Sequence, residues 1–130
     1  MIVAVDFDGI LCGDAFPEIG EPNYEMISLV REIIDAGHEV VLWTCRVDQR
    51  LVEAVEWCHD RGLHFCAVND NAPSNKAKYG KEYPNGTRKV YADVYMDDKD
   101  AQFRRIVAEE GYDKALEYLE YGVRKVVLDV

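Results

Sequence analysis

The chain opens with MIVAVDFDG, residues 1–9, in which five apolar residues are followed directly by two carboxylates and a glycine. A short apolar run of this kind is typical of a strand buried in a parallel sheet. Asp6 and Asp8 stand two positions apart, so a persisting pleat turns both carboxylates to one side and Phe7 into the core. Gly9 then permits a sharp turn of the backbone. The stretch predicts a buried first strand with an acidic end.

Comparable runs recur along the chain and alternate with segments of helical spacing. We expect five strands, at 1–5, 38–43, 64–68, 90–96 and 124–130. Residues 69–88 form a polar stretch with no clear period. The alternation predicts a single α/β domain over residues 1–130, a three-layer αβα arrangement with a mainly parallel sheet covered on both faces.

The expected helices have recognisable ends. Asn23 caps the first, which ends at Ala36-Gly37, and Asp48 caps the second, which ends at Arg61-Gly62. One or two further helices fall between residues 100 and 121, with a break near Gly111.

Composition narrows the class of protein. A formal net charge of −10 disfavours binding to nucleic acid or to acidic membranes, because such binding usually requires a basic surface.

We find neither a signal-peptide pattern nor an apolar run of the roughly 20 residues that span a bilayer, so we expect a cytoplasmic protein. Four cysteines without a C-x-x-C pair, at positions 12, 45, 58 and 66, are expected to be reduced thiols rather than a zinc site.

Polar groups end three of the expected strands, namely Asp6 and Asp8, then Thr44, then Asp97-Asp98. Ligands of open parallel sheets bind beyond the carboxyl ends of the strands, so these groups are expected to converge. Clustered carboxylates repel one another unless a cation is present, and oxygen ligands without histidine or cysteine favour Mg²⁺. Each feature also has an ordinary interpretation: Asp97-Asp98 as a helix cap, and Thr44 as a plain strand residue.

Phosphoryl transfer requires in-line placement of a nucleophile and neutralisation of the equatorial oxygens. Thr44 is a hydroxyl that can donate to a phosphoryl oxygen, and Lys89, just before the fourth strand, is the expected cation. Lys76 and Lys78 in the polar stretch are the alternatives, and any of these lysines is also compatible with a solvated surface position.

Three segments together carry a resemblance to a known family: residues 6–11 (DFDGIL), 42–46 (LWTCR) and 95–98 (YMDD). In this order after successive strands, they resemble motifs I, II and IV of the haloacid dehalogenase superfamily, and most of all its small capless members from bacteria and phages. The resemblance covers the chain from Met1 to about Arg105. It implies a Rossmannoid fold in which the strands that bear motifs I and IV are neighbours.

The resemblance also implies roles. Asp6 would attack phosphorus and form an aspartyl phosphate, while Asp8 would protonate the leaving oxygen and then activate water. Mg²⁺ would be held by Asp6, the backbone carbonyl of Asp8, and Asp97, with Asp98 as a further ligand or a supporting group. Thr44 and a lysine would bind the phosphoryl oxygens. The expected function is a Mg²⁺-dependent phosphomonoester hydrolase acting on a small phosphorylated metabolite, nucleotides included.

Two departures from the superfamily pattern affect this prediction. The motif III lysine commonly opens a helix, whereas Lys89 directly precedes a strand. The segments between the motifs are too short for a cap domain, so substrate contacts are expected from residues beside the site: Gly9, Cys45, Arg46 and Asn69, with the 10–22 loop and Arg50 as further candidates.

Other classes of protein remain open at this point. One is a non-catalytic protein that binds phosphate or Mg²⁺ on the same fold. Another is a receiver-like phospho-acceptor module, although receivers carry the acidic pair and the phosphorylated aspartate on different strands. The sequence leaves open whether the chain is a monomer or a homo-oligomer.

Overall fold

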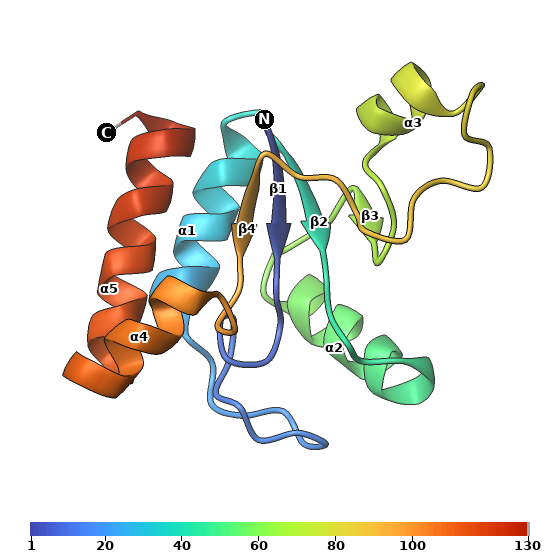
Figure 1. Cartoon of the computed structure of the whole chain (residues 1–130). Helices are drawn as coiled ribbons and strands as arrows, with labels where there is room; N and C mark the ends of the chain where they lie inside the picture. Colours follow the sequence, from blue (N-terminus) through green and yellow to red (C-terminus); the bar gives the residue numbers. More distant parts are fainter. Residues whose placement is uncertain (130) are drawn as a thin grey trace.

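Four parallel strands form the centre of the computed structural model, which describes residues 1–129 (Figure 1). Their spatial order is β3-β2-β1-β4, with β1 paired to β2 from Ile2↔Glu39 and to β4 from Val3↔Val94. The strands are β1 (Ile2–Val5), β2 (Glu39–Leu42), β3 (Ala67–Val68) and β4 (Val94–Met96). The helices are α1 (Tyr24–Asp35), α2 (Asp48–Asp60), α3 (Pro73–Tyr79), α4 (Ala101–Glu110) and α5 (Tyr112–Val123). The predicted α/β class with a parallel sheet is confirmed.

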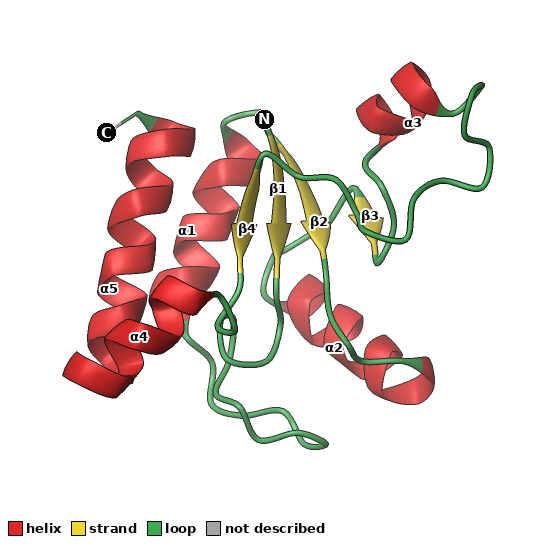
Figure 2. Cartoon of the chain, viewed as in Figure 1, coloured by secondary structure: helices red, strands yellow, loops and turns green. Residues whose placement is uncertain are grey.

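The two faces of the sheet are covered by different structures. Val3 and Val5 point into the larger core, which contains residues of α1, α2, α4 and α5. Ala4 lies on the other face, in a smaller core with Val41 and Val90. The residues packed on this second face come from the segment from 69 to 92, among them Ala72, Val90 and Ala92, whereas α3 lies beyond the β3 edge of the sheet (Figure 2). One layer is therefore helical, and the other consists mostly of loop.

The first helix follows the sequence signals closely. The Asn23 side chain accepts a hydrogen bond from the backbone N–H of Met26 at 3.2 Å, which satisfies one of the free donors at the helix start. The apolar face predicted from the spacing is buried, and Gly37 adopts a positive φ of 92° just beyond the helix. Gly111, with a φ of 96°, separates α4 from α5 as expected.

Several expected element ends differ in the structure. Asp48 does not cap α2: it is the first residue of the helix, and Val47 holds the cap position without a side-chain hydrogen bond. The strand expected from residue 90 begins only at Val94, because the backbone N–H of Ala92 donates to the Tyr95 hydroxyl instead of to a neighbouring strand. The polar stretch of 69–88 contains α3.

The strand expected at 124–130 is wrong for the residues that the structure describes. Arg124–Leu128 form a π-helical turn that continues α5, and Val130 lies outside the described residues. Each residue added to an existing helix gains a hydrogen bond, and no new helix has to be nucleated. Continuing α5 is therefore favourable for these residues. None of the helices within residues 1–129 is both long and apolar enough to cross a membrane, and the expected cytoplasmic location stays a prediction.

Candidate active site

The polar ends of three strands meet at the carboxyl edge of the sheet. The Asp6 N–H donates to the Met96 carbonyl and the Trp43 N–H donates to the Val5 carbonyl, both at 2.9 Å, so the chain stays in register as it leaves each strand. A cleft with a volume of about 380 Å³ lies beyond this edge. It is lined by Asp6, Asp8, Asp14, Phe16, Trp43, Thr44, Cys45, Arg46, Asp97, Asp98 and Lys99.

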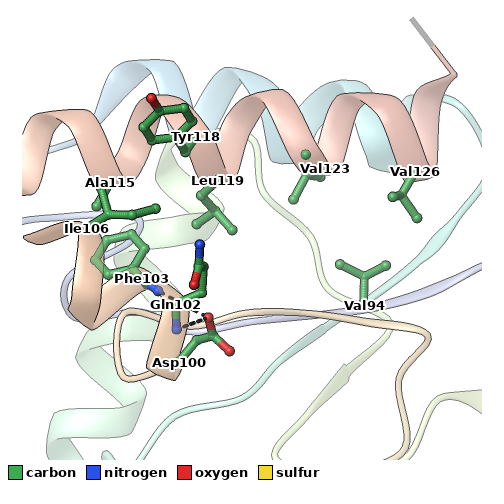
Figure 3. A pocket seen from close by; sticks show the side chains of 11 residues that line it. Val94, Asp100, Gln102, Phe103, Ile106, Ala115, Tyr118, Leu119, Val123 and Val126 are labelled. Atoms are coloured by element: carbon green, nitrogen blue, oxygen red, sulfur yellow. Dashed lines mark hydrogen bonds between the residues drawn. The ribbon is translucent and has the colours of Figure 1, made fainter.

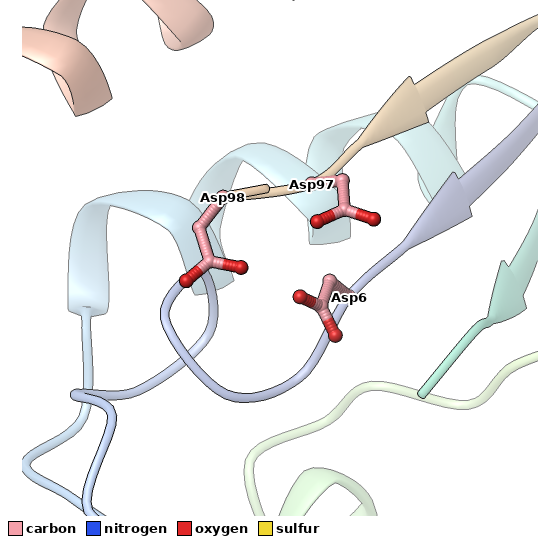
Figure 4. A group of neighbouring side chains, drawn as sticks. All are labelled: Asp6, Asp97 and Asp98. Carbon is pink, nitrogen blue, oxygen red and sulfur yellow. The ribbon is translucent and has the colours of Figure 1, made fainter. Parts of the chain in front are cut away.

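Three carboxylates gather on one side of this cleft. Asp6, Asp97 and Asp98 each present an oxygen within 4.8 Å of the others, and Figure 4 shows the three side chains turned toward one another from the ends of β1 and β4. Burial and the adjacent carboxyls of Asp98 and Asp97 raise the pKa of Asp6 well above the usual range of an aspartate. The group consists only of hard oxygen donors, which fits Mg²⁺.

Gly9 does not line the cleft. Its role is to let the backbone pass close to the carboxylate cluster. Its φ is +89°, and a Cβ there would stand 2.2 Å from Oδ2 of Asp98. The hydroxyl of Tyr112, from the start of α5, donates to the Gly9 carbonyl. The glycine predicted as a substrate contact is thus a packing position that allows Asp98 to approach the turn.

The side chain of Asp8 is separate from the carboxylate cluster, because it is paired with Arg46. Nε and Nη2 of Arg46 each donate to a different oxygen of Asp8, both at 2.8 Å. The Arg46 side chain is 1% exposed, so this bidentate pair is largely shielded from water. The backbone-carbonyl ligand role expected for Asp8 stays a prediction.

Arg46 also connects the site to the loop that follows β1. Its Nη1 donates to the Pro17 carbonyl at 3.2 Å, and its Nη2 donates to the Glu18 carbonyl at 2.9 Å. The guanidinium carbon lies 5.1 Å from the centroids of the Phe7 and Phe16 rings. The residue predicted as a substrate contact therefore holds Asp8 and the loop in place.

Thr44 is held at the cleft by two backbone hydrogen bonds. Asn69 Oδ1 accepts from the Thr44 N–H at 2.8 Å, and Thr44 Oγ1 accepts from the Arg46 N–H at 3.1 Å. Among residues 1–129 the Thr44 hydroxyl makes no hydrogen bond as a donor, so its hydrogen can be donated to a ligand. Asn69 does not line the cleft but orients Thr44 from the position directly after β3. Cys45 lines the cleft and is exposed, as a substrate contact requires.

The expected placement of Lys89 is wrong. A parallel strand begins at the edge of the sheet opposite to the edge where it ends, and Lys89 lies before β4, with its Nζ 5.2 Å from the Tyr95 ring centroid. Lys76 and Lys78 also lie outside the cleft. Lys99 is the lysine at the site, with Nζ 3.2 Å from Oδ2 of Asp98.

Sequence reasoning missed two residues of the cleft, Trp43 and Lys99, and of the 10–22 loop expected to contact substrate it named no single residue, although Asp14 and Phe16 line the cleft. The sequence does contain a signal for Lys99. It directly follows Asp97-Asp98, so it must lie at the same edge of the sheet as these two carboxylates. The apolar Trp43 was assigned only to the strand that precedes Thr44. Asp14 and Phe16 lie in a loop without a period, which gave no sign of where their side chains would lie.

Comparison with known proteins gives one informative likeness. No protein-family model matches the chain, and no curated protein matches it. Among solved structures it is similar to a conserved protein from Bacteroides thetaiotaomicron, with a TM-score of 0.68 and 30% sequence identity. The alignment covers 87% of this chain and 94% of the Bacteroides chain, so the likeness extends over most of both chains.

Proposed function

The chain belongs to the same family as this conserved Bacteroides protein, and we propose from its own site that it is a Mg²⁺-dependent phosphomonoesterase. The observation that carries the proposal is the grouping of Asp6, Asp97 and Asp98 within 4.8 Å beside the hydroxyl of Thr44. Repulsion among three carboxylates is relieved by a divalent cation, and the hydroxyl offers a donor for a phosphoryl oxygen.

Asp6 is the proposed nucleophile. One carboxylate oxygen attacks phosphorus, the bond to the ester oxygen breaks, and an aspartyl phosphate forms. The Phe7 N–H donates to Oδ1 of Asp6 at 2.9 Å, which fixes that oxygen and leaves Oδ2 as the attacking atom. Mg²⁺, held by Asp6, Asp97 and Asp98, would supply the positive charge that offsets the phosphate and the carboxylates.

Asp8 is the proposed proton carrier. Its two oxygens each accept one hydrogen bond from Arg46 and keep a further lone pair that can hold a proton. The protonated Asp8 gives that proton to the leaving oxygen as the aspartyl phosphate forms, and the resulting carboxylate takes a proton from water during hydrolysis of the phosphoenzyme. Thr44 and Lys99 are the groups placed to bind phosphoryl oxygens.

The substrate is proposed to be a small phosphorylated metabolite. The cleft of about 380 Å³ suits a small molecule, and within residues 1–129 no separate domain covers it. The test is turnover of a panel of phosphate monoesters with Mg²⁺, first with wild type and then with Asp6→Asn. We expect wild-type turnover and none in the variant. Binding of phosphate without turnover of any ester would instead support the non-catalytic alternative, and a stable phosphoenzyme that never turns over would support a receiver-like module.

A further inference from the structure

The charge of this chain is distributed very unevenly. Residues 76–89 carry five of its 15 basic residues and one of its 25 acidic residues, although the whole chain has a net charge of −10. Tyr79 and Tyr83 lie within this basic segment and Tyr91 follows it; all three side chains are exposed. Basic and aromatic side chains interleaved in this way are typical of surfaces that bind nucleotides and single-stranded nucleic acid.

The basic segment encloses a cavity of about 760 Å³, larger than the catalytic cleft. Its walls include the three tyrosines together with Lys76 and Lys78. It shares no lining residue with the catalytic cleft. In Figure 1, α3 and the loop after it lie toward the end of the sheet where β1 begins, away from the edge where β1 and β4 end.

A buried amide holds the cavity open. Asn71, which is 5% exposed, donates from Nδ2 to Thr87 Oγ1 at 3.3 Å and accepts at Oδ1 from the Tyr91 N–H at 2.8 Å. These bonds join the start of the polar stretch to its end, across the loop of residues 80–86. The cavity is therefore built by side-chain contacts and is not only a gap beside an exposed loop.

The groups that face the cavity select for an anion with a planar ring. Lys76 neutralises Asp70, whereas Lys78 forms no ion pair among residues 1–129 and lies 5.3 Å from the centroid of the Tyr79 ring. Within the same described residues, Tyr83 and Tyr91 make no aromatic ring pair, so their faces are free to stack. Lys78 offers an unpaired charge for a phosphate.

We propose that this cavity is a second binding site, one for nucleoside phosphates, with the base stacked on a tyrosine ring and the phosphate bound by Lys78. It is independent of the catalytic cleft and of the phosphomonoesterase proposal. Mononucleotides and single-stranded oligonucleotides share this chemistry, and the experiment distinguishes them.

The test is calorimetric titration of the full chain in EDTA, without added metal, so that turnover does not contribute. Adenosine monophosphate should bind, and adenosine or ribose 5-phosphate, which each lack one of the two recognised groups, should bind at least tenfold more weakly. The double variant Lys78→Ala/Tyr83→Ala should lower the affinity for the nucleotide at least tenfold. The matched control Lys125→Ala/Tyr121→Ala, which removes a similar exposed pair on the C-terminal helix, should stay within twofold of wild type.

A single-stranded oligothymidylate of eight residues gives the second arm. Affinity well above that of the mononucleotide, falling steeply with salt, would identify a polynucleotide ligand, and equal affinity would identify free nucleotides. The proposal is overturned if neither probe binds at millimolar concentration, or if Lys78→Ala/Tyr83→Ala binds as wild type does. It is also overturned if Asp6→Asn abolishes binding, because that places the nucleotide in the catalytic cleft. Protection of Lys78 from acetylation by the nucleotide, read by mass spectrometry on the wild-type chain, checks the site without any substitution.

Discussion

Arg46 donates one hydrogen bond to each carboxylate oxygen of Asp8, both at 2.8 Å, from a side chain that is 1% exposed. The pair fixes the rotation of the Asp8 carboxylate, because a planar guanidinium and a planar carboxylate that share two bonds must lie nearly in one plane. The same guanidinium bonds the Pro17 and Glu18 carbonyls. Asp8 and the loop that borders the cleft are therefore held by one side chain.

Replacing Arg46 should cost stability as well as activity. Arg46→Met leaves Asp8, which is 18% exposed, without its partner and removes two hydrogen bonds to the loop. Breaking a buried pair costs about 3 kcal/mol, measured as the free energy of unfolding in urea. Arg50→Met is the control, because Arg50 and Glu53 are 42% and 37% exposed, and it should cost less than about 1 kcal/mol. Equal losses for the two variants would contradict a structural role for the Asp8–Arg46 pair.

The lysine that acts on phosphate is expected to be Lys99. Lys99→Ala should lower turnover more than tenfold, because Lys99 is the lysine that lines the cleft, whereas the other cation there, Arg46, is paired with Asp8. Lys89→Ala removes a lysine that lies by Tyr95, away from the cleft, and should change turnover less than twofold. Steady-state rates with one aryl phosphate compare the two variants. A larger effect at Lys89 would mean that the polar stretch folds over the cleft when substrate binds.

The sequence predicts the positions of Asp6, Thr44 and Asp97 because the direction of a parallel strand determines which of its ends faces the ligand. The same rule places Lys89 at the opposite edge, because Lys89 precedes the expected strand at 90–96 and Asp97 follows it. Proximity to the acidic residues along the sequence therefore does not bring the lysine near them in space.

The partners of Asp8 and Gly9 could not be predicted from the sequence. The Asp8–Arg46 bond spans 38 positions and the Tyr112–Gly9 bond spans 103, so neither has a local pattern. Arg46 follows a strand end and was expected to face substrate, whereas burial beside Phe7 and Phe16 turns it inward. The Asn23 cap, in contrast, can be predicted from the sequence, because its hydrogen bond to the Met26 N–H spans only three residues.

The carboxylate cluster should make stability and activity depend on Mg²⁺. Mg²⁺ should raise the melting temperature of wild type, because a ligand that binds only the folded state stabilises it. Asp97→Asn removes one ligand and should largely abolish that increase. Turnover should stop in excess EDTA, and Ca²⁺ should bind but inhibit because of its larger and more flexible coordination shell. Full activity in EDTA would refute the metal role of Asp6, Asp97 and Asp98.

Cys45 should be the most readily alkylated thiol, and its modification should block the cleft. Burial raises the pKa of Cys58 to about 12 and that of Cys12 to about 11, so both remain protonated and unreactive at pH 7.5. Cys66 is exposed, but burial of its thiol raises its pKa as well. Peptide mapping after brief treatment with iodoacetamide should find the label on Cys45, with turnover lost in proportion. The variant Cys45→Ser should keep its activity through the same treatment, and inactivation of that variant would assign the effect to another thiol.

The different surroundings of Asp6 and Asp8 predict different consequences for their amide variants. Asp6→Asn removes the nucleophile, so no phosphoenzyme can form and turnover should be lost for every ester. Asp8→Asn keeps the nucleophile and keeps one oxygen that can accept from Arg46, but it cannot carry a proton. The contribution of such a proton carrier is roughly 100-fold to 10,000-fold.

The loss in Asp8→Asn should depend on the leaving group. An alkyl phosphate leaves as a strongly basic alkoxide that needs a proton, whereas p-nitrophenolate leaves without one, so phosphorylation of Asp6 should be preserved for the aryl ester. Hydrolysis of the aspartyl phosphate still lacks its base and becomes slow. Stopped-flow mixing with p-nitrophenyl phosphate should therefore show a burst of about one p-nitrophenolate per site, followed by slow turnover. Mass spectrometry should place one phosphoryl group on Asp6. A phosphoryl group on Asp8, or equal losses for aryl and alkyl esters without a burst, would contradict the proposed division of roles.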